Sequence, residues 1–274
     1  MINIGNLSLI LTIFATLWAI FALAYGSKKR SKDFIDSGRR GVNCAFFLVT
    51  LSSIMLVYGF VTRDFSIKYI AEHSSRDLPL FYTISAFWAG QEGSLLFWLW
   101  LLSLFGAILV WRKRKAEDEL TNYTLLVIVG TELFFSLVVA LWSNPFARFI
   151  YQSPPEDGAG LNPLLQNFYM IFHPPTLFIG FAGFTVPFAY ALGALMSGRS
   201  GNSWIPRSRP WTIFSWIFLT LGIVLGGKWA YVELGWGGYW AWDPIENASL
   251  FPWLTATAFL HSVMVQERMK VKLS

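Results

Sequence analysis

Histidine side chains are the groups in this sequence best suited to bind a metal, and the 274 residues contain three of them. His173 stands in MIFHPPTLF, where two following prolines place it at the beginning of a helix, because proline fits the first turn but not later ones. One interpretation is a residue that caps this helix or forms a hydrogen bond at a membrane interface. The other is an axial ligand to the metal of a bound cofactor, since histidine is the commonest metal ligand. The residues alone leave both interpretations open.

His261 lies inside the last long apolar stretch, LTATAFLHSVMVQER. A histidine within a membrane span needs a partner, because an unsatisfied polar group in hydrocarbon is costly. A serine or threonine of another helix could accept a hydrogen bond, but we favour ligation of a haem iron. A bis-histidine haem would need a second histidine within the membrane, and this sequence does not contain one. His73, in IAEHSSRDL, has polar neighbours and is expected to be a solvated surface residue.

The densest group of chemically useful residues is WGGYWAWDPIENASLFPW, residues 236–253, which contains four tryptophans. Asp243 is a good N-cap, Pro244 suits the first helical position, and Glu246 follows the cap by three residues, as in a capping box. A helix is therefore predicted to begin here and to run into the membrane, with a kink at Pro252. Capping would by itself explain Asp243 and Glu246, but it does not exclude a part in binding.

The residues before this cap predict a surface for a flat ligand. Glycines let the backbone turn and approach a ligand closely, and the rings offer large planar faces. An interfacial aromatic belt would explain the rings, but neither the glycines nor the Asp-Pro break. Haem fits, because it is flat and apolar with two anionic propionates: His173 could reach its iron, and the indole N–H groups, Asn247 or Lys228 could meet its polar edge. The cofactor-binding residues expected here are Trp236, Gly237, Gly238, Tyr239, Trp240, Trp242, Asp243, Pro244, Glu246, Asn247 and Trp253.

These side chains must be positioned by helices that cross a membrane. The chain is 55% hydrophobic and 14% charged, whereas about a quarter of the residues of a globular protein are charged. Seven apolar runs approach the roughly 20 residues that span a bilayer, and lipid leaves the backbone of such a span no alternative to a helix. We therefore predict an all-α, polytopic membrane protein with a single membrane domain, 1–274. The predicted spans are 6–25, 42–61, 93–111, 121–141, 168–196, 211–227 and 248–266.

The distribution of lysine and arginine predicts the orientation. Sixteen of the 21 basic residues fall in three connections and the C-terminal tail, all at one end of the predicted spans, and five fall at the other end. Because positive charge is retained in the cytoplasm, the N-terminus is expected outside and the C-terminus inside. The expected location is a bacterial-type cytoplasmic (inner) membrane with the functional face outside. The net charge of +5 reflects this topology, and no nucleic-acid partner is expected.

Three longer outer segments carry the remaining candidates. Residues 62–92 are expected to contain a helix that lies flat in the interface and ends at Gly90. A stretch rich in proline, glycine and asparagine follows the fourth span and should be irregular, and residues 228–253 contain the predicted platform. Cys44 has no partner for an intrachain disulfide, and we expect a small buried hydrophobe. Glu132 lies in the middle of the fourth span, where it could pair with a polar helix neighbour.

The tryptophan-rich stretch resembles the WWD signature of the haem-handling proteins of cytochrome c biogenesis. Within that group the chain most resembles one family, the CcmF-type cytochrome c haem lyase subunits, and it matches the N-terminal portion of that family. Further motifs carry this resemblance, in the same order along most of the chain. They are SNPF, LNPLLQ, IFHPP, RPWT, SWIFLTLGIVLG, YVELGWGG and HSVMVQER.

The resemblance implies a haem lyase component that acts in cytochrome c maturation. Proteins of this family hold haem at the outer membrane face and attach its vinyl groups to the two thiols of a CxxCH motif in apocytochrome c. By this resemblance, His173 binds the iron of an outer substrate haem, and His261 binds the iron of a separate haem b within the membrane. The implied partners are a haem chaperone, apocytochrome c, thiol-reducing maturation factors and membrane lipid. No strong acid–base pair is visible, which agrees with a mechanism that positions vinyl groups near thiols.

The sequence departs from the family pattern at two positions. Tyr239 stands where a second tryptophan is common, so the expected platform is altered but still aromatic. Gln91 stands where histidine is often found, so no outer histidine can be assigned there. The family also continues well beyond Ser274, and the missing part would supply the second outer and second intramembrane histidine. We therefore expect either a second chain that carries the C-terminal half of the lyase or a truncated sequence, which alone would bind haem incompletely.

Two other functions are alternatives to the attachment of haem to apocytochrome c. A membrane b-type cytochrome could use His261 as a ligand and bind quinone at the outer site, but such a protein would be expected to pair histidines at helical spacing within one span. A haem exporter would be expected to show broken helices or internal repeats, and neither is evident. Both alternatives leave a haem-sized outer aromatic platform unexplained.

Overall fold

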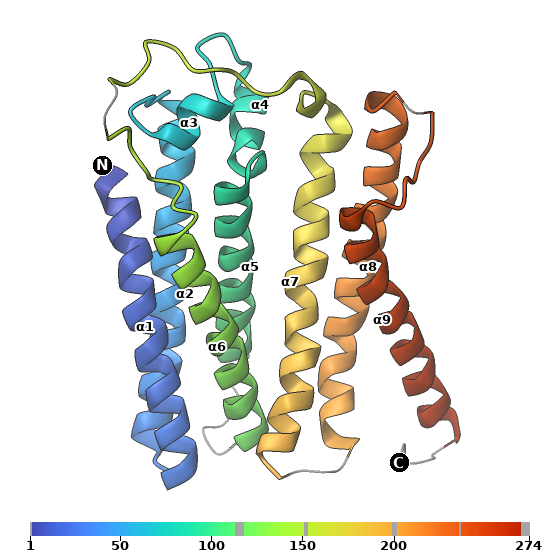
Figure 1. Cartoon of the computed structure of the whole chain (residues 1–274). Coiled ribbons are helices and arrows are strands. Elements are labelled where there is room, and N and C mark those ends of the chain that lie inside the picture. Colours follow the sequence, from blue (N-terminus) through green and yellow to red (C-terminus); the bar gives the residue numbers. More distant parts are fainter. Residues whose placement is uncertain (1, 113–117, 151–152, 199–201, 236, 270–274) are drawn as a thin grey trace.

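Seven long helices stand side by side in the computed structural model of the chain (Figure 1). The structure describes residues 2–112, 118–150, 153–198, 202–235 and 237–269. Within these ranges, seven helices are long and apolar enough to cross a membrane. They are α1 (Ile2–Lys29), α2 (Lys32–Val61), α5 (Gln91–Trp111), α6 (Glu119–Leu141), α7 (Phe168–Met196), α8 (Ile205–Glu233) and α9 (Pro244–Met269). The short elements are α3 (Lys68–His73), α4 (Leu80–Ser85) and the 3-10 turns η1 (Ala86–Trp88), η2 (Pro163–Leu165) and η3 (Asn202–Trp204).

Each predicted span corresponds to one of these helices, which confirms the all-helical, multi-spanning architecture. Several helices extend beyond the predicted ends, and the extensions carry polar residues. For example, α2 begins at Lys32 although the apolar run begins at residue 42. Hydrophobic length predicts only the part of a helix that lies in lipid, whereas backbone hydrogen bonding continues into the polar flanks.

Glycines allow the long helices to approach one another closely. A methyl group added at Gly180 of α7 would lie 2.8 Å from the backbone nitrogen of Leu219 in α8. One added at Gly38 of α2 would lie 3.0 Å from the backbone nitrogen of Leu23 in α1. Small residues at such positions bring whole backbones into van der Waals contact, which drives helix association where lipid removes the hydrophobic effect.

The two ends of the bundle differ. In Figure 1 the N-terminus, α3, α4 and the α8–α9 connection lie at the upper end, and the α1–α2 connection, the C-terminal end of α7 and the N-terminal end of α8 lie at the lower end. The basic connections therefore share one end and the longer segments share the other. The side of the membrane that each end faces stays a prediction from charge.

The segment between α2 and α5 is held together by Tyr69. Its hydroxyl accepts a hydrogen bond from the Gly90 N–H at 3.0 Å and donates to the Phe87 carbonyl at 3.0 Å. Burial raises the pKa of the Tyr69 hydroxyl above its ordinary value, so the side chain stays a neutral donor. Gly90 itself is the N-cap of α5, and η1 ends shortly before it.

The expectation of a solvated His73 is wrong. Its ring packs on the ring of Tyr69 with 4.5 Å between the centroids, and its Nδ1 lies 2.9 Å from the Tyr69 carbonyl oxygen. Both residues lie on one face of α3, because they are four apart, and that face turns toward Gly90. The polar neighbours in the sequence gave a misleading signal, since Glu72 points to the other side and is exposed.

Two further expectations about single residues fail. Cys44 is exposed on α2 rather than buried. In a membrane protein an apolar side chain gains little by leaving lipid, so its chemistry does not predict burial. Glu132 of α6 is fully buried, but neither carboxyl oxygen has a hydrogen-bond partner among the described residues.

Candidate functional site

The helix predicted to start after the tryptophan-rich loop does start there. Pro244 is the first residue of α9, and the Asp243 carboxylate accepts the Glu246 N–H at 2.7 Å. The Asp243 carbonyl oxygen also accepts the Asn247 N–H at 3.0 Å. Asp243 is therefore the N-cap, which satisfies one of the donors that the first helical turn leaves without a partner.

Glu246 fastens the loop to the first turn of α9. In a capping box it would accept the N–H of the cap residue, but here one carboxylate oxygen accepts the N–H groups of Ala241 and Trp242, each at 2.7 Å. Two successive N–H groups converging on one oxygen form an anion-binding nest. Trp242 has a φ of +62°, which is strained for a residue with a Cβ. A hydrogen bond from the Asn247 amide to the Trp242 carbonyl, at 3.1 Å, helps to hold this conformation.

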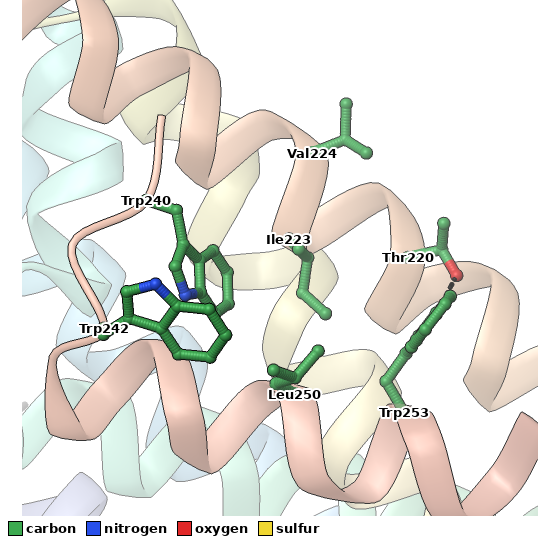
Figure 2. A pocket seen from close by; sticks show the side chains of 7 residues that line it. All are labelled: Thr220, Ile223, Val224, Trp240, Trp242, Leu250 and Trp253. Atoms are coloured by element: carbon green, nitrogen blue, oxygen red, sulfur yellow. Dashed lines mark hydrogen bonds between the residues drawn. The ribbon is translucent and has the colours of Figure 1, made fainter. Parts of the chain in front are cut away.

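A pocket of about 490 Å³ opens between this loop and the two helices that flank it in the chain, α8 and α9 (Figure 2). Trp240 and Trp242 form one end and meet edge to face, with 5.9 Å between their centroids. Trp253 forms the other end and donates a hydrogen bond to Thr220 at 2.7 Å. The indole nitrogen of Trp240 is buried and has no hydrogen-bond partner among the described residues. The lining consists of Thr220, Ile223 and Val224 of α8, Trp240 and Trp242 of the loop, and Leu250 and Trp253 of α9.

This pocket has the character of a small-molecule site. Its volume lies within the roughly 300–1,000 Å³ of known ligand pockets, and its walls are apolar and aromatic. A buried indole N–H without a partner can donate to an acceptor atom of a ligand. Sequence reasoning missed the four aliphatic and hydroxyl residues of the lining. Their three- and four-residue spacing places them on one face of each helix. Nothing in the sequence distinguishes a face that lines a pocket from a face that contacts lipid.

The structure distributes the predicted platform residues over two places. Tyr239 does not line the pocket, and its ring stacks on Tyr231 of α8 at 4.5 Å between centroids. The Lys228 ammonium lies 5.4 Å from the centroid of the same Tyr231 ring. Gly237 has a φ of +72°, which a glycine adopts without strain. Trp236 lies outside the described residues.

The sequence predicted that His173 lies in the first turn of its helix, and this prediction is wrong. α7 begins at Phe168, where the Asn167 side chain caps it by accepting the Tyr169 N–H at 2.8 Å. Pro174 therefore lies inside the helix rather than at its start. Transmembrane helices tolerate such prolines because neighbouring groups satisfy the freed carbonyls, and the asparagine cap supplies a start upstream of the histidine.

The ring of His173 is fixed by α8. Its Nδ1 lies 2.7 Å from the Gly222 carbonyl oxygen, which can only accept, so Nδ1 carries the proton and Nε2 carries the lone pair. The ring also lies parallel to Trp229, with 6.4 Å between the centroids and 12° between the planes. A methyl group at Gly226 would collide with the imidazole, so the glycine leaves the space that the ring occupies. Such a backbone partner orients metal-binding histidines and fixes their tautomer.

The structure does not bring His173 together with Trp240 and Trp242 in one cavity. Its contacts on α8 lie on one face of that helix, and the pocket is lined by residues of another face. His173 is absent from the pocket lining within the described chain. The imidazole and the aromatic pocket are thus two separate elements of the candidate site.

His261 lies exposed on α9, roughly 25 Å along the helix from Pro244. The structure shows no hydrogen bond from its ring to another described residue, so the interhelical partner considered above is not found there. The described residues also contain no group of three or more histidine, cysteine or acidic side chains that could hold a metal ion. A metal at His173 or at His261 would therefore need further ligands from elsewhere.

The chain is similar to known proteins over nearly its whole length. The cytochrome c assembly protein family matches residues 88–274. The cytochrome c-type biogenesis protein CcmF of Haemophilus influenzae is 42% identical over 267 residues, which cover 97% of this chain and 41% of that protein. The biogenesis protein NrfE of the same organism is 44% identical over 271 residues, and CcmF of Escherichia coli is 43% identical over 269.

A solved structure shows the same fold. The cytochrome c heme lyase CcmF superposes with a TM-score of 0.83 at 34% identity, over 97% of this chain and 42% of that one. The chain therefore spans about two fifths of the length of the relatives it matches. The family match covers more than half of the chain and includes α5 to α9, with His173 and the tryptophan-rich loop. This chain belongs to the cytochrome c assembly protein family.

Proposed function

We propose that the chain acts in cytochrome c maturation as part of a CcmF-type haem lyase in a bacterial cytoplasmic membrane. The observation that carries this proposal is His173, held by the Gly222 carbonyl with its Nε2 lone pair free. The fold around it is that of a solved heme lyase. A fixed imidazole with this tautomer is the form that binds iron. The end of the bundle with the tryptophan-rich loop faces outward in this proposal.

The residues present suit haem as the substrate of the outer site. Trp240 and Trp242 supply apolar planar faces, and the unpartnered indole N–H of Trp240 can donate to an acceptor on the edge of a porphyrin. His173 supplies the nitrogen ligand. Since the histidine and the tryptophans face different sides of α8, we assign them different tasks: the histidine binds the iron, and the tryptophans contact the ring edge.

The chain's contribution to the reaction is positioning. In the ligation step a cysteine S–H of the apocytochrome adds across a vinyl C=C of haem, which forms a C–S bond and leaves no group to be expelled. Holding both reactants at contact distance replaces a bimolecular encounter with an intramolecular one. Glu246 contributes indirectly, because it orients the loop that carries Trp242. A haem chaperone delivers the haem, and thiol-reducing factors keep the apocytochrome thiols reduced.

His261 is proposed as one ligand of a second haem, a haem b within the membrane. Its exposed position on α9 lets it face a neighbouring segment that the described residues do not include. A second chain, or a further segment like the rest of the longer relatives, would supply the opposing ligand. The three histidines lie on α3, α7 and α9, so no helix carries the histidine pair expected of an electron-carrying b-type cytochrome.

The test is haem retention together with cytochrome c yield. The chain is co-expressed with the remaining part of the lyase and purified in detergent, and its haem spectrum is recorded. His173→Ala should lose the outer haem and stop maturation, whereas His73→Ala, a histidine outside the site, should retain both. Full outer haem and normal cytochrome c in the His173→Ala form would remove the assignment.

A further inference from the structure

A second cavity lies far from the candidate haem site, on the face of α1 and α2. It has a volume of about 480 Å³, and these two helices stand at the opposite end of the row from α8 and α9 (Figure 1). The helices of the candidate site take no part in it. The lining consists of Leu11, Ala15 and Trp18 of α1, and of Ser37, Arg40, Gly41, Cys44 and Leu48 of α2. We call this cavity the α1–α2 groove.

The groove is polar at one end and apolar at the other. Along α2 the lining begins with Ser37 and Arg40 and continues to Leu48, at the three- and four-residue spacing of a single face. Along α1, which runs in the opposite direction, Trp18 lies beside the polar end. Its indole nitrogen donates a hydrogen bond to the Ser37 hydroxyl at 3.2 Å. Leu11 therefore lies toward the apolar end of the groove.

The apolar pattern of α2 predicts that Arg40 lies near the boundary between water and hydrocarbon. The predicted apolar run of α2 starts at residue 42, and Arg40 lies about 12 Å along the helix from Lys32, where α2 begins. It is exposed, and no hydrogen bond or ion pair of this side chain is found among the described residues. Arg39 next to it is engaged, because it donates to Asn122 at 2.9 Å. Asp36, one turn earlier, does not line the groove.

We propose that the α1–α2 groove binds one anionic phospholipid. The phosphate pairs with Arg40, the indole of Trp18 lies at the level of the glycerol, and an acyl chain follows the apolar end past Leu11 and Leu48. Cations just outside the hydrocarbon attract anionic headgroups, and tryptophan prefers this depth. A soluble anion would use only the cation and leave the apolar part of the groove empty. The site is independent of haem, so it stands or falls separately from the proposed function.

Cys44 allows a direct test, because it is the single cysteine of the chain and lies exposed in the groove. The rate at which N-ethylmaleimide modifies Cys44 is measured for the full chain in detergent micelles. Added phosphatidylglycerol should slow the modification in a saturable way, and phosphatidylcholine should slow it far less. Arg40→Gln should raise the phosphatidylglycerol concentration for half-maximal slowing about fivefold, the contribution of one cation near an anionic headgroup.

Three controls make the result decisive. Lys32→Gln removes the same charge from α2 outside the groove and should leave the concentration dependence unchanged. Arg40→Lys keeps the charge and should retain most of the effect. Equal slowing by phosphatidylcholine, an equal loss in both glutamine variants, or slowing by glycerol phosphate alone would each overturn the proposal. Thermal unfolding in the same detergent verifies that the variants are folded.

Discussion

The two ends of the helix row are packed to different degrees. In the apolar stretches of α1 and α2 at one end, 39% and 33% of the residues are buried, whereas the values for α8 and α9 at the other end are 22% and 17%. Each candidate site residue lies on or beside the sparsely packed helices, and the best-buried side chains lie near α1, α2, α5 and α6. The densely packed part is a scaffold, and the exposed part offers surfaces that a ligand or a further segment can cover.

The difference also separates two kinds of polar group. In the packed part, Glu132 is buried without a hydrogen-bond partner in the described chain, which costs stability. At the sparsely packed end, His173, Asp243 and Glu246 all have local partners that set their direction. Polar groups that a site needs are thus already oriented, although the surfaces around them are open.

The largest expected effect concerns the space beside His173. Gly226→Ala should lower haem retention in the co-purified lyase by about tenfold or more, because the new methyl group collides with the imidazole and a displaced ligand costs 10- to 100-fold in affinity. Gly130→Ala is the matched control, since a methyl group there meets nothing within 4 Å. Similar haem content in both variants would show that the observed ring position is not the binding one.

In the densely packed part of the molecule, by contrast, a substitution is expected to increase stability. Glu132→Leu is expected to raise the unfolding free energy by about 2 kcal/mol, because it removes a buried carboxyl group without a partner. Thermal unfolding in detergent measures this change. Glu119→Leu on the same helix, whose carboxylate lies 3.9 Å from Arg30 at the surface, should change stability by less than about 1 kcal/mol. A large loss of stability in the Glu132 variant would mean that this group has a partner in the assembled protein.

The attachment of the tryptophan-rich loop can be broken selectively. Glu246→Ala removes the acceptor of the Ala241 and Trp242 N–H groups, so these amides should exchange hydrogen about tenfold faster. Hydrogen–deuterium exchange with mass spectrometry reports this change. Amides of the packed α5 should exchange as before. Unchanged exchange in the loop would show that the nest does not hold Trp242.

The smallest expected effect is the difference in stability between substitutions of two pocket tryptophans, Trp253 and Trp240. Trp253→Phe should lower stability by about 1 kcal/mol through loss of the hydrogen bond to Thr220. Trp240→Phe should leave stability nearly unchanged, because its N–H has no partner in the described chain, but it should weaken haem retention. Unfolding curves and haem content of the two variants separate these roles. A stability loss for Trp240→Phe as large as that for Trp253→Phe would contradict the assignment of the free N–H to a ligand.

Much of the fold could be predicted because its causes are local in sequence. The apolar runs predicted all seven long helices, and the Asp-Pro pair predicted the start of α9 at the correct residue. The same reasoning misplaced His173 within α7, because Asn167 caps the helix upstream of the proline pair. A competing cap of this kind is visible in the sequence, but its strength relative to the prolines is not.

What the sequence determined by itself was the set of membrane helices, the α9 cap and the presence of a histidine and a tryptophan-rich loop suited to haem. Only the tertiary structure decided that Gly222 of α8 orients His173, that Trp240 and Trp242 close a pocket on a different face of α8, and that Cys44 is exposed. Helix formation depends on hydrogen bonds and apolar length within one segment. The face that a helix presents to its neighbours depends on all the helices at once, so no single segment specifies it.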